Sequence, residues 1–304
     1  MSFLNEYRAC TLCPRACGVD RASGGVGACH AGMLPRVAHT MLHAWEEPCI
    51  SGERGSGTVF FSGCSLGCVY CQNRDISGRY IGAEYDENAL ADLFLSIEAQ
   101  GAHNVNLVTG THHIPHLAEA IATAKKRGLS VPIVYNTSGY ERPSSLRMLA
   151  GLVDVYLTDF RYASEKTAHL YSRAPEYPAV AEEALEEMVR QTGAPRFDGG
   201  GMMQGGVIVR ILLLPSHLIE AKQILHRVYS RFGDSVYISL MSQYTPIGDI
   251  GVRFPSLGRR VTPYEYASFV DYARTLGITQ AFTQEGESAS ESFIPPFCEE
   301  KQAK

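Results

Sequence analysis

Three cysteines stand close together in the sequence, at Cys64, Cys68 and Cys71, with the spacing C-x3-C-x2-C. Thiolates this close suit a soft metal centre, and a cubane iron–sulfur cluster is the main candidate. Three ligands leave the fourth iron of a cubane without a protein ligand, so that iron can bind and reduce a substrate. A structural zinc site would usually take a fourth protein ligand, and disulfide pairing would leave one cysteine over. The spacing therefore predicts an iron–sulfur cluster with one open iron.

A second group of cysteines lies within residues 1–35, which are rich in glycine and have little apolar periodicity. It comprises Cys10, Cys13, Cys17 and Cys29, the first three with the spacing C-x2-C-x3-C. A segment with so few apolar residues needs a metal or a neighbouring domain to hold it. Four thiolates suffice for a closed zinc site or an auxiliary iron–sulfur cluster, and the alternative is reduced thiols that merely pack. The lack of paired C-x2-C knuckles favours the cluster over zinc.

These cysteines need a scaffold, and from about Gly57 onward short apolar runs alternate with amphipathic segments. Near-continuous apolar runs are typical of parallel strands that are covered on both faces. We expect strands at 57–62, 104–109, 131–135, 153–158, 207–214, 235–241 and 278–282. We expect helices at 86–100, 115–127 and 266–276, and a glycine-rich mobile loop at 198–206. Such βα units in one direction indicate an α/β fold with a parallel barrel, a partial barrel or a doubly wound sheet.

Polar and charged residues follow the ends of these strands, where parallel α/β folds carry their ligand sites. They are Thr109, Gly110, Thr111, His112 and His113 after the second strand, Asn136 and Ser138 after the third, Asp159 and Arg161 after the fourth, and Arg210 within the fifth. Together they predict a binding site for a polar cofactor. His112 and His113 are the candidates for proton transfer, because histidine titrates near neutral pH. Such histidines more often only make local hydrogen bonds.

The overall composition limits the class of protein. The chain has 304 residues, 45% of them hydrophobic, which is enough for the core of one large α/β domain with a small appendage. Its formal net charge is -5 and it has no run of Lys and Arg, which argues against nucleic-acid binding. No apolar stretch is long enough to span a membrane, and no secretory signal is visible. Because clustered cysteines suit a reducing compartment, we expect a soluble, cytoplasmic protein.

With an aromatic residue, Tyr70, directly before the last cysteine, the C-x3-C-x2-C loop resembles the hallmark of the radical S-adenosylmethionine (SAM) superfamily. Within that superfamily the chain is similar to proteins related to pyruvate formate-lyase-activating enzyme, in an uncharacterised iron–sulfur branch. The similarity is carried by the stretches 10–19, 46–52, 55–64, 101–109, 134–141 and 292–297. It implies a partial (β/α)6-type parallel barrel over residues 36–285, with a Cys-rich metal-binding segment over 1–35 before it and a C-terminal tail over 286–304 after it.

The resemblance also implies which residues hold the cofactor. Cys64, Cys68 and Cys71 match the ligands of a 4Fe-4S cluster. The amino and carboxylate groups of SAM would chelate the fourth iron of this cluster. Tyr70 matches a position whose backbone contacts the adenine of SAM.

At further positions the sequence follows the family's pattern only in part. The family's Gly-Gly-Glu, which holds the methionine amino group of SAM, is replaced by Thr109-Gly110-Thr111. Hydroxyl or carbonyl oxygens would then have to take over this role. Asp159 with Arg161 matches an Asp-x-Lys pattern in which Arg replaces Lys, and Arg210 matches a basic position expected near the SAM carboxylate.

The chemistry that the resemblance implies is reductive cleavage of SAM to a 5′-deoxyadenosyl radical, which abstracts hydrogen from a substrate. Activase-like proteins take this hydrogen from a glycine of a partner, a glycyl radical enzyme. The alternative substrate is a peptide or a small metabolite. An electron donor such as flavodoxin or ferredoxin would be a further partner. A hypothesis from another class is a non-catalytic iron–sulfur or zinc protein, which the missing Gly-Gly-Glu supports.

Overall fold

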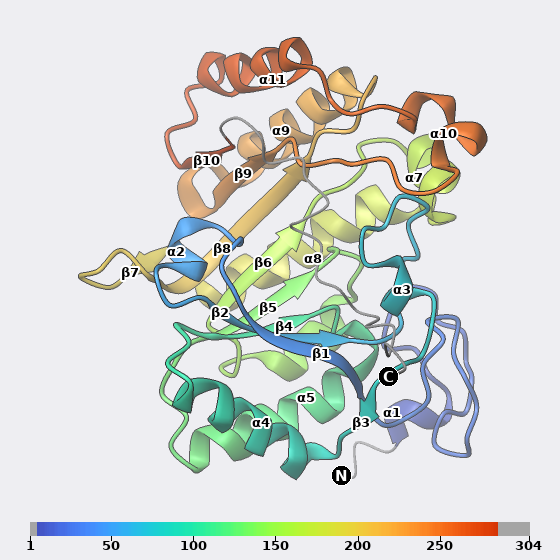
Figure 1. Ribbon diagram of the computed structural model, residues 1–304, viewed down its shortest axis with the longest axis vertical. Helices are drawn as coiled ribbons and strands as arrows, with labels where there is room; N and C mark the ends of the chain where they lie inside the picture. The colour runs from blue at the N-terminus through green and yellow to red at the C-terminus, as the bar shows by residue number, and fades with distance from the viewer. Residues whose placement is uncertain (1–4, 285–304) are drawn as a thin grey trace, which may run out of the picture.

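The computed structural model describes residues 5–284, in which an open and mostly parallel sheet is flanked by helices (Figure 1). The strands are β1 (Arg36–His43), β2 (Ser56–Phe61), β3 (Ala83–Glu84), β4 (Val105–Val108), β5 (Ile133–Thr137), β6 (Val155–Asp159), β7 (Arg196–Phe197), β8 (Met203–Leu212), β9 (Tyr237–Met241) and β10 (Ala281–Thr283). Their order in the sheet is β10-β9-β8-β6-β5-β4-β2-β1-β3, and β7 pairs with β8 beside this path. The sheet from β2 to β10 is parallel and does not close, so the architecture is a partial parallel barrel.

The strands form where the sequence has short runs without polar interruption. All six residues of β2 are buried, and so are the four residues of β4. Strands buried on both faces cannot show a polar alternation, which explains why continuous apolar runs predict them. Each of the seven expected strands overlaps a strand of the central sheet.

The helices are α1 (Asn5–Arg8), α2 (Pro48–Ser51), α3 (Arg74–Ser77), α4 (Glu87–Ala99), α5 (Ile114–Lys126), α6 (Pro143–Leu146), α7 (Glu165–Ser172), α8 (Tyr177–Thr192), α9 (Leu218–Phe232), α10 (Ile250–Arg253) and α11 (Pro263–Thr275). Local signals fix where several of them begin. The side chain of Asp86 accepts a hydrogen bond from the N–H of Ala89 at the start of α4. Thr262 and Glu265 form a capping box at the start of α11.

Two segments differ from the expectation. The glycine-rich stretch 198–206 is not simply a loop, because β8 begins at Met203 and pairs with β7 as an antiparallel hairpin. The carboxylate of Asp198 closes its turn by accepting hydrogen bonds from the N–H groups of Gly200 and Met202, at 2.8 and 2.9 Å. Strand β1 was not expected at all. It lies near the sheet edge, pairs antiparallel with β2 and β3, and has half of its residues partly exposed, so it lacks a continuous apolar run.

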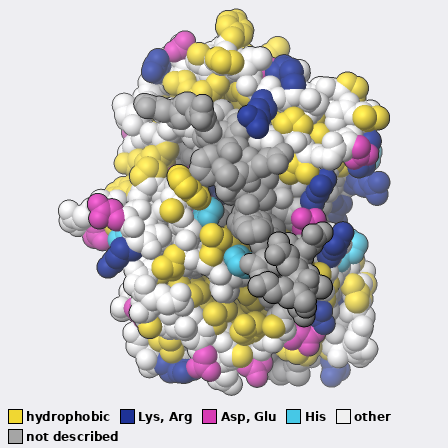
Figure 2. Space-filling model, viewed as in Figure 1, with side chains coloured by type: hydrophobic (Ala, Val, Ile, Leu, Met, Phe, Trp, Pro, Cys, Tyr) yellow, Lys and Arg dark blue, Asp and Glu magenta, His cyan; other side chains and the backbone are white. Residues whose placement is uncertain are grey.

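The surface of the described residues carries mixed charges. On the face shown in Figure 2, Lys and Arg side chains lie scattered toward the edges among acidic and neutral groups. Within residues 5–284 no helix combines the length and the apolar character that crossing a bilayer requires. The expected C-terminal tail at 286–304, including the similar stretch 292–297, lies outside the described residues.

Candidate cofactor site

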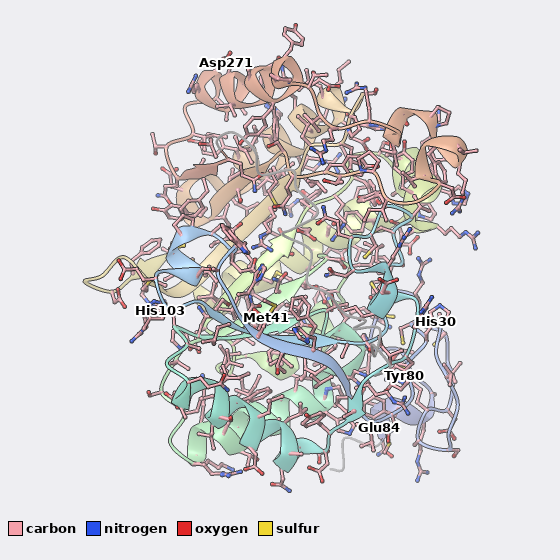
Figure 3. The ribbon with its side chains drawn as sticks, viewed as in Figure 1. His30, Met41, Tyr80, Glu84, His103 and Asp271 are labelled. Atoms are coloured by element: carbon pink, nitrogen blue, oxygen red, sulfur yellow. The ribbon has the colours of Figure 1, made fainter. Side chains whose placement is uncertain are left out.

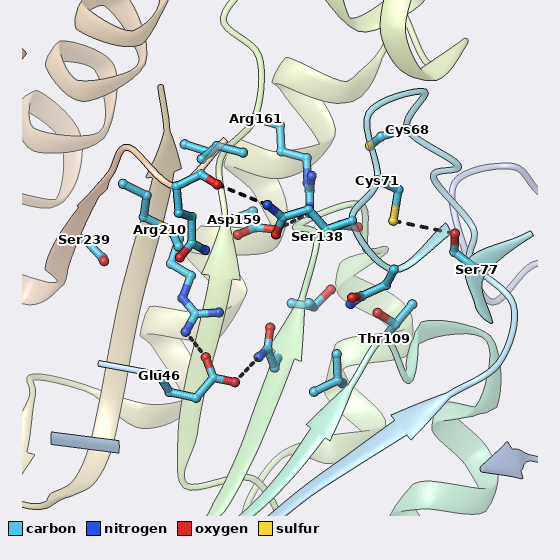
Figure 4. Close-up of a pocket in the computed structure, with 18 of the residues that line it drawn as sticks. Glu46, Cys68, Cys71, Ser77, Thr109, Ser138, Asp159, Arg161, Arg210 and Ser239 are labelled. Atoms are coloured by element: carbon cyan, nitrogen blue, oxygen red, sulfur yellow. Dashed lines mark hydrogen bonds and ion pairs between the residues drawn. The ribbon is translucent and has the colours of Figure 1, made fainter. Parts of the chain in front are cut away.

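A pocket of about 300 Å³ lies where the carboxyl ends of the parallel strands meet the cysteine loop (Figure 4). The residues around it are Cys64, Cys68 and Cys71, the polar residues Tyr70, Thr109, Asn136, Ser138, Asp159, Arg161 and Arg210, and the apolar residues Trp45, Leu212, Met241 and Phe282, among others. Its volume is at the lower end of the range for small-molecule sites. The fold thus brings the cysteine loop and most of the polar strand ends into one cavity.

The cysteine loop follows β2 directly, and hydroxyl groups point at two of its sulfur atoms. The Oγ of Ser172 donates a hydrogen bond to the Sγ of Cys68 over 3.0 Å. The Oγ of Ser77 donates to the Sγ of Cys71 over 3.5 Å, as Figure 4 shows. Such donors stabilise the thiolate form, which is the form that binds metal.

The surroundings of the loop keep its cysteines protonated as long as no cation is bound. Burial, together with the neighbouring thiolates of Cys64 and Cys68, raises the pKa of Cys71 to about 11. Burial also raises the pKa of Cys64. Thiolates this close repel one another, and iron ions supply the positive charge that offsets this repulsion. The donor set therefore fits a cluster with three protein ligands.

Tyr70 lines the pocket but uses its ring for packing. The ring lies edge-on against the rings of Tyr162, Tyr171 and Tyr244, with centroid distances between 6.0 and 6.4 Å. Only 6% of the residue is exposed. This packing fixes the backbone between Cys68 and Cys71, the part of the chain that the resemblance assigns to adenine contact.

Thr109 reaches the pocket in a strained conformation. Its φ of 62° lies in the left-handed region, which a β-branched residue rarely adopts. The backbone N–H of Thr109 donates to the carbonyl of Asn136 over 2.9 Å, which ties the end of β4 to the end of β5. Strain of this kind concentrates at ligand sites, and Thr109 is the member of the Thr-Gly-Thr turn that faces the cavity.

The other two residues of this turn lie behind the pocket wall, contrary to the expectation that they contact the cofactor. A Cβ on Gly110 would approach Leu117 Cδ1 to 2.5 Å, so Gly110 packs against the side chain of Leu117 on α5. The hydroxyl of Thr111 donates to Glu141 Oε1 over 2.6 Å and so points away from the cavity.

Glu141 is a functional candidate that the sequence reasoning missed. It is fully buried and accepts hydrogen bonds on Oε1 from Thr111, Thr137 and Tyr135, at 2.6, 2.5 and 3.3 Å. Burial raises the pKa of this carboxyl to about 7. A carboxylate therefore does stand behind the Thr-Gly-Thr turn, but it comes from the loop after β5. The only sequence signal for it is its place in the similar stretch 134–141.

Arg210 does not offer a free guanidinium to the pocket. Its Nε and Nη2 donate to the two carboxylate oxygens of Glu47, at 2.8 and 2.6 Å, and Nη2 also pairs with Glu46. The charge and hydrogen bonds of Arg210 outweigh the effect of burial and hold the pKa of Glu47 below its usual range. The other oxygen of Glu46 accepts from the side-chain amides of Asn106 and Asn136, at 3.0 and 3.3 Å. The expected contact of Arg210 with a SAM carboxylate would have to compete with this ion pair.

Asp159 and Arg161 pair with each other at the pocket wall, at 2.5 Å between Oδ2 and Nη2. The Nε of Arg161 is buried and has no hydrogen-bond partner within residues 5–284. A buried donor without a partner is costly, so a ligand in the pocket can stabilise the site by supplying an acceptor.

His112 and His113 do not line the pocket. Their exposed fractions are 1% and 0%, and the Nε2 of His112 lies 2.8 Å from the carbonyl of Ser62. Burial and the charge of Arg21 lower the pKa of His112 to about 3. Both histidines pack under the Cys-rich segment, on the flank where Figure 3 places His30 and Tyr80. The proposed proton transfer to substrate therefore has no support in their placement.

The N-terminal cysteines lie against the cysteine loop of the pocket. Cys10, Cys13 and Cys29 are buried, and Cys17 is exposed. The carbonyl of Cys29 accepts a hydrogen bond from the N–H of Cys64 over 3.0 Å. A backbone hydrogen bond thus links the two groups of cysteines directly, although they are separated in sequence.

Arg15, which lies within the N-terminal group, strengthens this junction. Its guanidinium donates to the carbonyls of Ser65 and Leu66, each at 3.1 Å, inside the cysteine loop. It also donates to the carbonyls of Ser172 and Arg173 at the end of α7, at 2.7 and 2.5 Å. One side chain thereby ties the Cys-rich segment, the cysteine loop and α7 together.

Comparisons with known proteins agree with this geometry. Residues 58–204 match the sequence model of the radical SAM superfamily. An uncharacterised protein of Methanocaldococcus jannaschii is 27% identical over 276 residues, which cover 88% of this chain and 75% of that protein. The crystal structure of a radical SAM methyltransferase from Sphaerobacter thermophilus superposes with a TM-score of 0.51 at 14% identity, over 75% of this chain and 65% of that chain. The last likeness concerns the fold alone, and the chain spans less than two thirds of that longer protein. The match to the superfamily model covers 147 of the 304 residues, just under half of the chain, so it is a similarity to this superfamily over residues 58–204.

Proposed function

We propose that the protein is a radical SAM enzyme that binds a 4Fe-4S cluster through Cys64, Cys68 and Cys71 and binds SAM in the adjoining pocket. The chemistry of this cofactor pair is one-electron cleavage of the S–C5′ bond of SAM, which yields methionine and a 5′-deoxyadenosyl radical. The radical then takes a hydrogen atom from a substrate. The observation that carries the proposal is that the three thiols and the polar strand ends line one cavity.

Different residues of the pocket make different contributions to the binding of SAM. Arg161 offers a buried and unpartnered Nε–H to an acceptor such as a carboxylate. Thr109, Asn136 and Ser138 offer carbonyl and hydroxyl or amide groups at the ends of β4 and β5. Arg210 instead holds the acidic loop at Glu46 and Glu47 in place. The tyrosines around Tyr70 exclude water from the side of the cysteine loop.

For the substrate, we propose a hydrogen donor that enters the same pocket. Resemblance of motifs supports a glycine of a partner glycyl radical enzyme, although the descriptions of the two relatives named above do not mention that function. The apolar side chains of Trp45, Met241 and Phe282 in the pocket lining favour a substrate with an apolar part, either a peptide or a small metabolite. A flavodoxin or ferredoxin would supply the electron. The proposal also includes a second metal centre at the N-terminal cysteines, either an iron–sulfur cluster or zinc.

The test is an assay for 5′-deoxyadenosine on anaerobically prepared, iron-loaded protein with dithionite and SAM. We expect product from the natural chain and from Cys49→Ala, which removes a buried cysteine outside both groups. We expect none from Cys68→Ala. Equal product from Cys68→Ala and the natural chain would contradict the proposal. If no protein forms product, SAM is titrated into the reduced protein while the EPR signal of the cluster is followed. An unchanged signal would show that SAM does not bind.

A further inference from the structure

Arg21 is a buried cation without a carboxylate partner. Its exposed fraction is 1%. Its guanidinium donates to the carbonyls of Gly32 and His112, at 3.0 and 2.7 Å, lies 3.7 Å from the Sγ of Cys10, and stacks over the ring of Tyr7. No Asp or Glu within residues 5–284 forms a salt bridge with it. A buried charge without a counter-charge is strongly unfavourable.

The other titratable groups around Arg21 cannot supply the missing negative charge. His113 Nδ1 lies 3.4 Å from its Nη2, and His112 and His116 lie close by. Histidine that binds no metal is neutral or positively charged. Burial raises the pKa of the Tyr7 phenol above its usual range, so this group stays neutral as well. The thiol that contacts Arg21 is that of Cys10, whose Sγ lies 3.7 Å from Nη1. A metal centre that binds the N-terminal cysteines as thiolates would supply the missing negative charge.

The sulfur atoms of Cys17 and Cys29 both lie close to Gly27. A Cβ on Gly27 would lie 3.3 Å from the Sγ of Cys29 and 3.6 Å from the Sγ of Cys17. The glycine thus leaves the space between these two sulfur atoms open. An open space between sulfurs is what a metal centre bound by thiolates requires.

The donor set and its spacing favour a cluster over zinc. All four candidate ligands are thiols, and their spacing, C-x2-C-x3-C followed by Cys29, lacks the paired C-x2-C knuckles of a zinc ribbon. Zinc would need four sulfur atoms at about 2.3 Å from a single point, whereas in a cubane each thiolate binds its own iron.

We propose that Cys10, Cys13, Cys17 and Cys29 hold a second 4Fe-4S cluster, and that the buried guanidinium of Arg21 is its counter-charge. The inference rests on the second metal centre of the proposed function and does not depend on the cleavage of SAM. Arg21 acts as a positioning residue, because it stabilises the thiolates rather than binding iron.

The first test removes the pocket cluster with the full-chain variant Cys64→Ala, Cys68→Ala, Cys71→Ala, prepared anaerobically. We expect this protein to keep about four irons and about four sulfides per chain and to give an EPR signal after reduction. Adding Cys17→Ala and Cys29→Ala should remove this iron, whereas adding Cys49→Ala should leave it. Zinc in place of iron, no metal, or iron that persists without Cys17 and Cys29 would overturn the inference. The assay for 5′-deoxyadenosine on the natural chain is separate, so failure of the proposed function is seen independently.

The second test addresses Arg21 in the same triple variant. We expect Arg21→Met to shift the reduction potential of the remaining cluster to a more negative value, because a positive charge beside a cluster favours its reduced form. Arg21→Lys should keep the potential close to that of the parent. If Arg21→Met does not fold, Arg21→Gln replaces it, since an amide can still donate to the carbonyl of Gly32. Equal potentials in the charged and neutral variants would show that Arg21 is not the counter-charge.

Discussion

The contribution of the buried Glu141 side chain to the stability of the protein depends strongly on pH. Its carboxyl is covered completely, and its Oε2 has no hydrogen-bond partner within residues 5–284. Burial therefore raises its pKa from 4.5 to about 7. The folded protein binds this proton more tightly than the unfolded chain does. The stabilising contribution is complete below pH 4.5 and is lost as the pH rises through about 7, and the shift corresponds to roughly 3 kcal/mol.

We predict that Glu141→Gln removes this loss of stability at rising pH. An amide of the same shape accepts hydrogen bonds from the same hydroxyl groups and does not titrate. The free energy of unfolding, measured with urea at several pH values below and above 7, should fall less steeply with pH in this variant than in the natural chain. Glu183→Gln, at an exposed position of α8, serves as the control and should keep the slope of the natural chain. Equal slopes in all three proteins would contradict the prediction.

At the scale of elements, the junction between the Cys-rich segment and the cysteine loop depends on Gly63, and the nearby Gly67 offers a comparison. Gly63 and Gly67 both adopt left-handed backbone, with φ of 85° and 67°. A Cβ on Gly63 would come within 2.5 Å of the carbonyl of Cys29, whereas a Cβ on Gly67 would meet nothing within 4 Å. Only Gly63 lets the loop approach the N-terminal segment closely enough for the bond from Cys64 to Cys29.

We predict that Gly63→Ala lowers the free energy of unfolding by about 1–3 kcal/mol more than Gly67→Ala does. Both variants have the strain of a left-handed alanine, but only Gly63→Ala must push the Cys29 carbonyl away. Gly63→Ala should also lose iron faster to a chelator, because the backbone bond between the two cysteine groups is disturbed. Urea unfolding and the decay of the cluster absorbance check this, and identical behaviour of the two variants would argue against the junction.

At the scale of the whole molecule, a buried ion pair of Arg210 with Glu46 and Glu47 links two distant parts of the chain. Glu46 and Glu47 precede α2, and Arg210 lies on β8, where Figure 4 shows it paired with Glu46. The exposed fractions of the three side chains are 9%, 4% and 10%. Removing the arginine would leave two carboxylates buried without a cation, which is the costly way to break a buried ion pair.

We predict that Arg210→Met lowers the free energy of unfolding by about 3–5 kcal/mol. Adding Glu47→Gln should recover part of the loss, because one uncompensated charge is then removed. Arg231→Met is the control, since Arg231 pairs with Glu182 and Glu186 on the exposed surface and should have little effect. Chemical unfolding of the four proteins checks this, and a failure of Glu47→Gln to recover any stability would show that the loss has another cause.

Much of this fold could be read from the sequence because its signals are local. The parallel strands are continuous apolar runs, and their observed bounds lie close to the expected ones, as β2 at Ser56–Phe61 and β6 at Val155–Asp159 show. The cap of Asp86 and the capping box at Thr262 involve residues three positions apart. The spacing of Cys64, Cys68 and Cys71 is equally local. Each of these features is decided by neighbours along the chain.

The direction in which side chains point was decided only by the tertiary structure. Thr109 faces the pocket while Thr111 turns away toward Glu141, and no local pattern separates the two threonines. Glu46 and Glu47 read as ordinary acidic residues, but they bind an arginine that lies more than 160 positions away in the chain. His112 and His113 follow a strand end, yet the docked N-terminal segment buries them. The sequence by itself determined the parallel strands, three of the long helices and the local spacing of the cysteines. The packing of distant segments decided which polar groups reach the cavity, because the counter-charges and hydrogen-bond partners of buried groups come from elsewhere in the chain.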